Sequence, residues 1–206
     1  MTRNGFLFID GENFKFKIEG ILKRRDLVAK GLTYLDLNMD LLFHKVIKGV
    51  VVKERNYYCA RLHYYKETSE KSTELINFQR KLKRSLLNKG FSFVVAGNVR
   101  LQARVDRFLN RKFIFGEKGV DVRIAVDLVS CAYDNVVDTV FLCSSDSDLQ
   151  PAIHKAREKG LEVVYIGFET SPNIGLSKTS NKTILLSEFE VLDCFERLNP
   201  WGKSSE

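Results

Sequence analysis

The chain has 206 residues, of which 44% are hydrophobic and 29% are charged, and its formal net charge is +7. This length supports one domain with a well-buried core and is too short for two average domains joined by a linker. No window approaches the roughly 18 uncharged apolar residues of a membrane span, and the residues around Arg3 do not form a signal peptide. We therefore expect a cytoplasmic protein with no membrane partner. The four cysteines and three histidines are scattered without C-x-x-C spacing, which argues against a zinc ribbon or a redox pair.

Short apolar runs alternate with helical patterns along the chain. The runs lack the polar alternation of a half-exposed strand, which is typical of parallel strands covered on both faces. We predict strands at 6–9, 56–62, 91–96, 139–143 and 162–166. We predict one helix after Asn13, which can cap it, and further helices at 35–46, 69–88, 120–133 and 149–159. This order predicts an α/β fold with a doubly wound, mainly parallel central sheet and helices on both faces.

The remaining segments set the expected domain organisation. We predict one domain whose main part covers residues 1–167, with a basic insertion near 98–118. The periodicity of that insertion fits either a helix or an extended chain. Residues 168–198 would supply a polar loop and a closing segment of the same domain. Residues 199–206 are expected to be a disordered tail.

Positive charge is concentrated between Phe78 and Lys112, where ten basic residues accompany one acid, Asp106. A basic stripe suits a polyanion, because each neutralised phosphate releases condensed counterions. A solvated helix face is the plainer interpretation of such a run. We predict that six of these side chains contact a nucleic-acid backbone: Arg80, Lys83, Arg84, Arg104, Arg107 and Arg111.

Acidic residues follow two of the predicted strands. Asp10 ends the first strand, and Asp146 and Asp148 come soon after the strand at 139–143. Ligands of doubly wound sheets bind beyond the carboxyl ends of the strands, where the strand order reverses. If these two strands are neighbours, their three carboxylates meet at that edge. Asp121 joins them if the helix that it begins points its N-terminus toward the same edge.

A cluster of carboxylates has a chemical consequence. Several of them close together repel one another unless a cation lies between them, and Mg²⁺ or Mn²⁺ prefers such oxygen ligands. One or two such ions could activate a water for phosphodiester hydrolysis. Each acid also has a structural interpretation, since Asp10 could cap a turn and Asp121 could interact with a helix dipole. A helix cap would explain one of Asp146 and Asp148, but not both.

Three strings of residues occur in a fixed order. They are FIDGENF at 8–14, KGVDV at 118–122 and SSDSDL at 144–149. Together they resemble the NYN domain, including its LabA-like branch, which belongs to the PIN-like nuclease superfamily. The resemblance implies a central parallel sheet and an acidic ribonuclease site that depends on Mg²⁺ or Mn²⁺. Matched residue by residue, it assigns the metal-binding and catalytic acids to Asp10, Asp121, Asp146 and Asp148, and a further catalytic position to Asn13.

The chain departs from the PIN-like pattern at two points. Many PIN-like enzymes have another acid early in the chain, and here the sequence offers Asp36 or Asp40 without a supporting motif. Glycine often precedes the acid that matches Asp146, and this chain has Ser145 there. The second change is small and should alter little.

We therefore predict a metal-dependent ribonuclease that hydrolyses single-stranded or structured RNA by in-line attack of water and leaves a 5′-phosphate. A homodimer could form through the last helix. One alternative is a weak or inactive RNA-binding module with the same fold. Another is a phosphohydrolase with a nucleophilic aspartate, but that class usually has a second Asp two residues later, where this chain has Glu12.

Overall fold

A computed structural model describes residues 3–105, 111–195 and 198, so the predicted tail at 199–206 lies outside the described residues. Seven strands form a single sheet in the order β4-β3-β2-β1-β5-β6-β7, and only β4 runs antiparallel to its neighbour. The strands are β1 (Arg3–Asp10), β2 (Val50–Arg61), β3 (Ser92–Val105), β4 (Arg111–Lys118), β5 (Thr139–Cys143), β6 (Glu162–Phe168) and β7 (Lys182–Leu186). This sheet confirms the predicted fold class.

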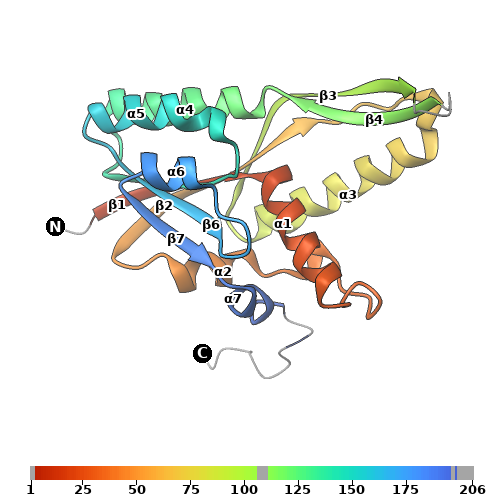
Figure 1. Cartoon of the computed structure of the whole chain (residues 1–206), viewed down its shortest axis with the longest axis horizontal. Helices are drawn as coiled ribbons and strands as arrows, with labels where there is room; N and C mark the ends of the chain where they lie inside the picture. The colour runs from red at the N-terminus through yellow and green to blue at the C-terminus, as the bar shows by residue number, and fades with distance from the viewer. Residues whose placement is uncertain (1–2, 106–110, 196–197, 199–206) are drawn as a thin grey trace.

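Helices cover both faces of the sheet (Figure 1). The α-helices are α1 (Gly11–Arg24), α2 (Met39–Val46), α3 (Ser69–Asn88), α4 (Val120–Asp134), α5 (Gln150–Glu158), α6 (Ile174–Thr179) and α7 (Glu188–Leu192). Short 3-10 helices are η1 (Tyr34–Asp36), η2 (Lys66–Thr68) and η3 (Ser147–Leu149). The predicted helix at 35–46 is therefore divided between η1 and α2.

Two hydrophobic cores lie on opposite sides of the sheet. Successive side chains of a strand point to opposite faces, so Leu7 and Ile9 enter one core while Phe8 enters the other. The first core packs the sheet against α1, α2, α3 and α7, and the second packs it against α4, α5 and α6. Burial on both faces explains why residues 6–9 of β1 form an uninterrupted apolar run.

The order in which the chain adds strands to the sheet reverses between β1 and β5. From β1 the chain builds outward through β2 and β3 on one side, and β5, β6 and β7 extend the sheet on the other. Ile9 is paired with Cys143, so the carboxyl ends of these two strands lie side by side. The two strands are therefore neighbours, which is the condition under which Asp10 was expected to meet the acids that follow β5.

The basic insertion is an antiparallel hairpin. Pairing of β3 with β4 runs from Asn98 opposite Lys118 to Val105 opposite Arg111, and Figure 1 shows the hairpin extending away from α4 and α5, on the same side as α3. Gly97 lies at its root with φ of 70°, where a Cβ would come within 2.0 Å of the Lys118 carbonyl oxygen. Only glycine permits this close crossing of the two chains.

The closing segment contains more regular structure than the sequence predicted. The polar loop includes α6, and the residues after it form β7 and the short α7 rather than one continuous segment. Asn173 caps α6 by accepting a hydrogen bond from the Leu176 amide at 2.9 Å. A six-residue helix has too few turns for its hydrophobic period to be visible, which is why the sequence did not reveal it.

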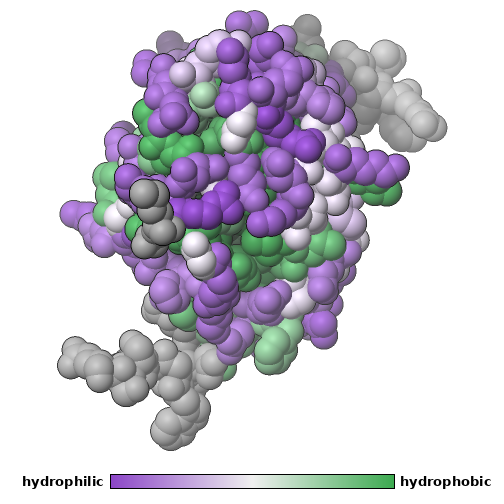
Figure 2. All heavy atoms as spheres, turned by 90° about the vertical axis from the view of Figure 1, so that its left-hand side faces the viewer, coloured by the Kyte–Doolittle hydropathy of each residue, from purple (hydrophilic) through white to green (hydrophobic). Residues whose placement is uncertain are grey.

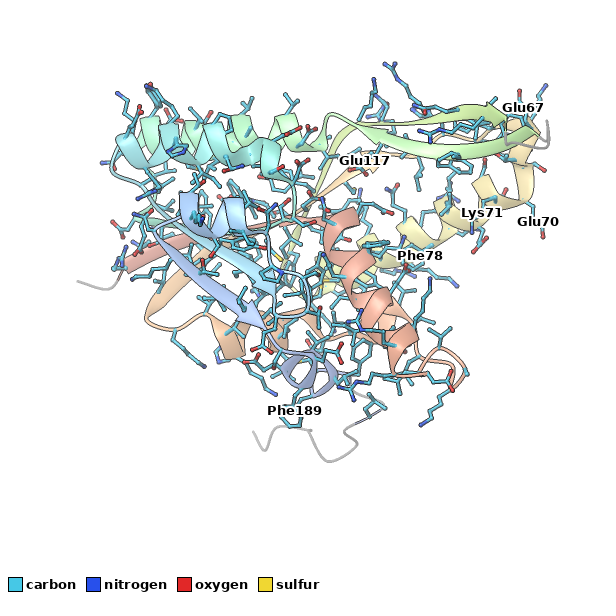
Figure 3. The ribbon with its side chains drawn as sticks, in the orientation of Figure 1. Glu67, Glu70, Lys71, Phe78, Glu117 and Phe189 are labelled. Carbon is cyan, nitrogen blue, oxygen red and sulfur yellow. The ribbon has the colours of Figure 1, made fainter. Side chains whose placement is uncertain are left out.

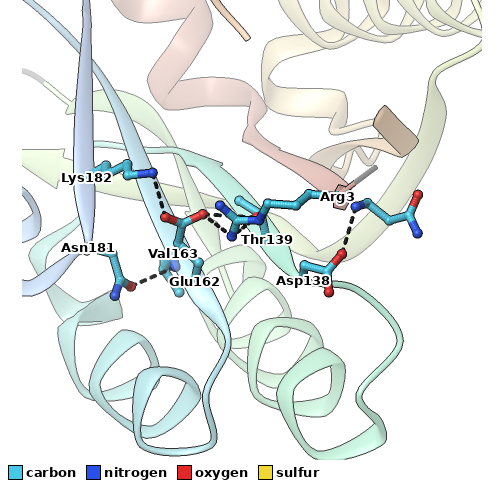
Figure 4. Close-up of polar contacts among 8 residues, drawn as sticks. Arg3, Asp138, Thr139, Glu162, Val163, Asn181 and Lys182 are labelled. Carbon is cyan, nitrogen blue, oxygen red and sulfur yellow. Dashed lines mark hydrogen bonds and ion pairs between the residues drawn. The ribbon is translucent and has the colours of Figure 1, made fainter. Parts of the chain in front are cut away.

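The amino-terminal edge of the sheet is closed by polar contacts (Figure 4). Glu162 accepts hydrogen bonds from Arg3 at 2.5 Å and from Thr139 at 3.1 Å, and it pairs with Lys182 at 2.9 Å. Burial alone would raise the pKa of Glu162, but these partners hold it below its ordinary value. Figure 2 shows the neighbouring surface as mainly hydrophilic with smaller apolar patches. This edge therefore has a structural role, and the candidate site lies at the other end of the strands.

Candidate active site

Asp10 joins β1 to α1. It is the N-cap of α1, with its Oδ1 accepting from the Asn13 amide at 3.3 Å, so the expected cap at Asn13 is wrong. An acceptor side chain on the residue preceding the first helical turn satisfies a free amide there. The Asn13 side chain instead donates from Nδ2 to Asp10 Oδ2 at 2.5 Å, and its own Oδ1 accepts from Ser145 at 2.5 Å. Asn13 therefore links Asp10 to the loop after β5.

That loop is tied to Asp10 a second time through Ser144. The Ser144 hydroxyl donates to Asp10 Oδ2 at 2.9 Å and accepts from the Asp146 amide at 3.1 Å. Asn173, at the start of α6, holds the same loop by donating to the Ser145 carbonyl oxygen at 2.9 Å. The sequence analysis gave no role to either serine or to Asn173, although the polar run beside Asp146 was a visible signal for the serines.

Asp146 and Asp148 play different structural parts. Asp146 is the N-cap of η3 and accepts from the Asp148 amide at 2.9 Å. The Asp148 side chain is exposed, and no helix cap accounts for it. Asp148 and Asp121 line one surface depression of about 570 Å³ between α4 and the start of α5. Helix capping thus explains one of the two loop acids, as the sequence predicted.

Burial and charge act together on Asp10. Its side chain is 3% exposed, and this desolvation raises its pKa. The hydrogen bonds from Asn13 and Ser144 act in the opposite direction, and the nearby negative charge of Asp146 raises the pKa further. The structure therefore brings Asp10 and Asp146 close enough to repel each other, which is the arrangement that a cation relieves.

Glu117 is a fifth acid at this edge, and the sequence analysis missed it. It is the penultimate residue of β4, and its Oε2 accepts from the Ala60 amide at 3.4 Å. Burial raises the pKa of Glu117 to about 7, with smaller contributions from the charges of Asp10, Glu12 and Asp121. Its position immediately before the matched string at 118–122 was the available signal.

The two acids nominated for the early position lie elsewhere. Asp36 accepts from the Thr33 amide at 2.8 Å and so closes the turn of η1. Asp40 forms an ion pair with Arg55. These contacts give both residues structural roles, and they are not part of the carboxylate edge. Asp127, on α4, also has structural partners, since it accepts from Tyr58 at 3.0 Å and pairs with Arg123 at 2.8 Å.

The donor chemistry of the edge suits a hard divalent cation, because every nearby acid offers carboxylate oxygens and neither histidine nor cysteine is required. The residues are not yet arranged as a complete coordination shell. Within the described part of the chain, no group of three or more His, Cys, Asp or Glu side chains is placed to hold a metal ion. The carboxylates therefore fit Mg²⁺ or Mn²⁺ in the kind of donor atom they offer.

The predicted nucleic-acid contacts are distributed over α3 and the hairpin. Arg80, Lys83 and Arg84 are exposed on α3, and Arg104 is exposed on β3. The Lys83 Nζ also lies over the Phe93 ring, 5.8 Å from its centroid. The Lys15 Nζ lies in the same way over the Phe78 ring, 5.2 Å from its centroid. Arg107 and the side chain of Arg111 lie outside the described residues.

The Glu117→Gln substitution should change how stability depends on pH. The wild type loses stability as pH rises from about 4.5 to about 7, because the unfolded chain ionises there while the folded protein keeps the Glu117 proton. The variant should be more stable than the wild type at pH 8 by roughly 1–2 kcal/mol, discounted for the partial exposure of this side chain, and should gain little at pH 4.5. Urea unfolding without divalent metal measures both values.

Glu67→Gln is the matched control, since Figure 3 shows Glu67 beside the start of α3 and well away from Glu117. It should leave the pH dependence of the wild type intact. An equal gain in both variants, or a gain for Glu117→Gln at pH 4.5 alone, would contradict the assigned charge environment.

The chain is similar to known proteins in both sequence and fold. A family model described as the NYN domain matches residues 6–187. An uncharacterised protein of Methanocaldococcus jannaschii is 31% identical over 93 residues, which cover 45% of this chain and 38% of that protein. A crystal structure of a protein of unknown function from Vibrio parahaemolyticus has a TM-score of 0.60 at 16% identity, over 90% of this chain and 93% of that chain. At that identity the likeness concerns the fold alone.

Two expectations about partners can be compared with the structure. Among the described helices, none is long and apolar enough to cross a membrane. A homodimer through the last helix finds no support, because α7 has five residues and packs Val191 into its own core. Phe189 is its one strongly exposed apolar side chain.

Proposed function

Because the chain belongs to the NYN domain family, which has a nuclease-like, RNA-related function, we propose that it is a metal-dependent ribonuclease. The observation that carries this proposal is the hydrogen-bonded junction of β1 and β5. There Asp10 is fixed by Asn13 and Ser144 and lies within the field of Asp146. A rigid acidic edge at the reversal of a doubly wound sheet is a suitable place for phosphodiester chemistry.

Asp10, Asp121, Asp146 and Asp148 are the residues that would hold Mg²⁺ or Mn²⁺. When bound, such an ion supplies charge stabilisation to the phosphate and lowers the pKa of a water. The chain's own contribution is positioning. Asn13 and Ser144 fix the orientation of the Asp10 carboxylate, and Ser144 also accepts from the Asp146 amide, which holds the Asp146 backbone beside Asp10. Exposed Arg80, Lys83, Arg84 and Arg104, with Arg107 and Arg111, would bind the RNA backbone, while hydrolysis leaves a 5′-phosphate.

Cleavage of a labelled single-stranded RNA by the wild type and by Asp146→Asn tests this proposal, each with Mg²⁺, Mn²⁺ or EDTA. We expect cutting by the wild type only with a divalent ion, and a loss of about 10²-fold or more in the variant with RNA binding retained. Equal cutting by both proteins, or cutting that survives EDTA, would count against the carboxylate site and indicate a contaminating nuclease.

A second function has one observation in its favour. The described acids are not gathered into a group of three around one point, and hydrogen bonds already occupy the Asp10 carboxylate. A module that binds RNA through the same surface without turnover would need no such group. RNA binding that is indifferent to metal, together with no cutting by folded wild type in any metal, would establish this function instead.

A further inference from the structure

A cavity of about 180 Å³ lies beside the carboxylate edge, in the angle between α3 and the root of the β3–β4 hairpin. Its walls are largely aromatic and aliphatic, and polar side chains from α1, α3 and β4 reach it. Figure 3 shows Phe78 on α3 and Glu117 at the hairpin root, the two sides between which the cavity is formed. The apolar walls include Tyr57, Leu75, Phe78, Phe93 and Phe115.

The size and walls of the cavity suit one flat ring. Pockets for drug-sized ligands hold about 300–1,000 Å³, so this cavity has room for a single small ring system. The rings of Tyr57 and Phe93 are stacked, with centroids 5.9 Å apart and planes 13° apart. Aromatic walls of this kind stack on any nucleobase, because every base presents a π-face.

Charge around the cavity decides which part of a nucleotide can enter. Glu12 and Glu117 are part of the wall. Glu12, joined by Glu117 once that side chain ionises, would repel a phosphate group, so the uncharged base has to face inward. Lys15 also lines the cavity, with its Nζ 5.2 Å from the centroid of the Phe78 ring. Lys83 lies 5.8 Å from the centroid of the Phe93 ring. Cations placed beside a ring pocket can hold the backbone of the strand that inserts the base.

The cavity lies next to the proposed site of cleavage. Gly11, which lines it, follows Asp10 in the chain, so their Cα atoms are about 3.8 Å apart. The charges of Asp10 and Asp121 also act on Glu117 in its wall. A strand whose phosphate lies at the carboxylates would therefore carry a neighbouring base to the mouth of the cavity.

We propose that this cavity is a base pocket, which takes one unpaired nucleobase of the RNA strand whose phosphate lies at the Asp10 edge. This inference rests on the proposed function and makes it narrower. The substrate is a strand with an unstacked base next to the scissile bond, because a base held inside a duplex cannot reach the pocket. Structured RNA is then cut only in loops, bulges or single-stranded ends.

The first test measures binding without cleavage. A short single-stranded RNA carrying one 2-aminopurine is titrated in EDTA with wild type, Phe78→Ala, Leu75→Trp and Phe189→Ala. Phe78→Ala removes a wall, Leu75→Trp fills the space, and Phe189→Ala makes the same change as the first at a phenyl ring that is 79% exposed on α7. We expect 2-aminopurine fluorescence to fall when the RNA binds wild type. The affinity for RNA should drop about 5- to 100-fold in Phe78→Ala and Leu75→Trp, and should not drop in Phe189→Ala.

The second test removes the base rather than the wall. An abasic nucleotide is placed in turn at each position of the same RNA, and binding is measured for wild type and Phe78→Ala. One position should weaken wild-type binding as much as Phe78→Ala does, and the two changes together should cost no more than either alone. Circular dichroism identifies folded variants, and Leu75→Trp decides if Phe78→Ala does not fold.

The outcomes separate this proposal from the one it rests on. Suppose that wild type cuts the RNA with Mn²⁺, that the folded pocket variants bind it as tightly as wild type does, and that abasic strands bind as tightly as the intact strand. These results would overturn the base pocket and leave the ribonuclease standing. Pocket-dependent binding with no cutting in any metal supports the base pocket within an RNA-binding module and overturns the ribonuclease. Failure of wild type to bind the RNA, with Mn²⁺ as well as in EDTA, overturns both.

Discussion

Replacement of Asp10 by asparagine should lower the rate of RNA cleavage by about 10³-fold, the largest functional effect that we expect from one residue. The substitution removes the negative charge from the centre of the β1–β5 junction, where Asn13 and Ser144 hold the carboxylate. The fold should survive, because an asparagine oxygen can still cap α1. Burial already raises the pKa of Asp10, so the neutral side chain avoids the desolvation of a charge. Single-turnover cleavage of single-stranded RNA with Mn²⁺ measures the effect.

Asp134→Asn provides the matched control for that experiment. Asp134 is exposed in the last turn of α4, at the end of the helix opposite Asp121. The same chemical change there should leave the cleavage rate within about twofold of wild type, as is usual for surface substitutions. A folded Asp10→Asn protein that cuts as fast as Asp134→Asn would remove Asp10 from the chemistry.

Gly11→Ala should cause the largest loss of stability among the changes considered, about 3 kcal/mol or more. Gly11 begins α1, and a Cβ there would lie 2.4 Å from a ring carbon of Tyr57 and 2.5 Å from the carbonyl oxygen of Tyr58. Tyr57 is buried and donates a hydrogen bond to the Gly11 carbonyl oxygen at 3.0 Å, so neither side can move freely. Urea unfolding measures the change, and a fall in Tm of roughly 6–12 °C should accompany it.

Gly20→Ala is the control within the same helix. Among the described residues, and apart from the backbone of α1 itself, only the end of the Arg24 side chain comes within 4 Å of a Cβ at Gly20, at 3.5 Å. The higher helix propensity of alanine should therefore prevail. This variant should gain about 0.5–1 kcal/mol. Helix propensity alone predicts a gain at both positions, so a stabilised Gly11→Ala protein would show that α1 does not approach β2 this closely.

The strands and helices of the sheet layers could be predicted because the pattern of apolar residues along each of them reflects which faces are buried. The apolar runs of β1 and β5 contain no alternation, which indicates strands covered on both faces, and the structure buries both strands between helices. The alternation of strands and helices then indicated a doubly wound sheet. Once β1 and β5 were neighbours, the meeting of Asp10 with the loop at 144–148 followed from the topology.

Other features depend on contacts between segments that are distant in sequence. The hairpin of β3 and β4 was ambiguous because its outer part, which includes the exposed Phe113 and Ile114, belongs to neither hydrophobic core, so no core imposes an alternating pattern there. Glu117 could not be assigned to the site because its role depends on the hairpin returning beside Ala60 and α1. The cap of α1 was misplaced for a local reason. Asp10 and Asn13 are one helical turn apart, and sequence signals define the end of a helix less accurately than that.

The most direct test of the central claim, that the acids at the β1–β5 junction hold a divalent ion, is a crystal of the protein grown with Mn²⁺ and measured at the manganese absorption edge. We predict an anomalous peak bounded by carboxylates of Asp10, Asp121, Asp146 and Asp148, and loss of that peak in Asp10→Asn. The claim would be contradicted if crystals at a Mn²⁺ concentration that supports cleavage in solution showed no peak at these carboxylates, or showed one only at another site.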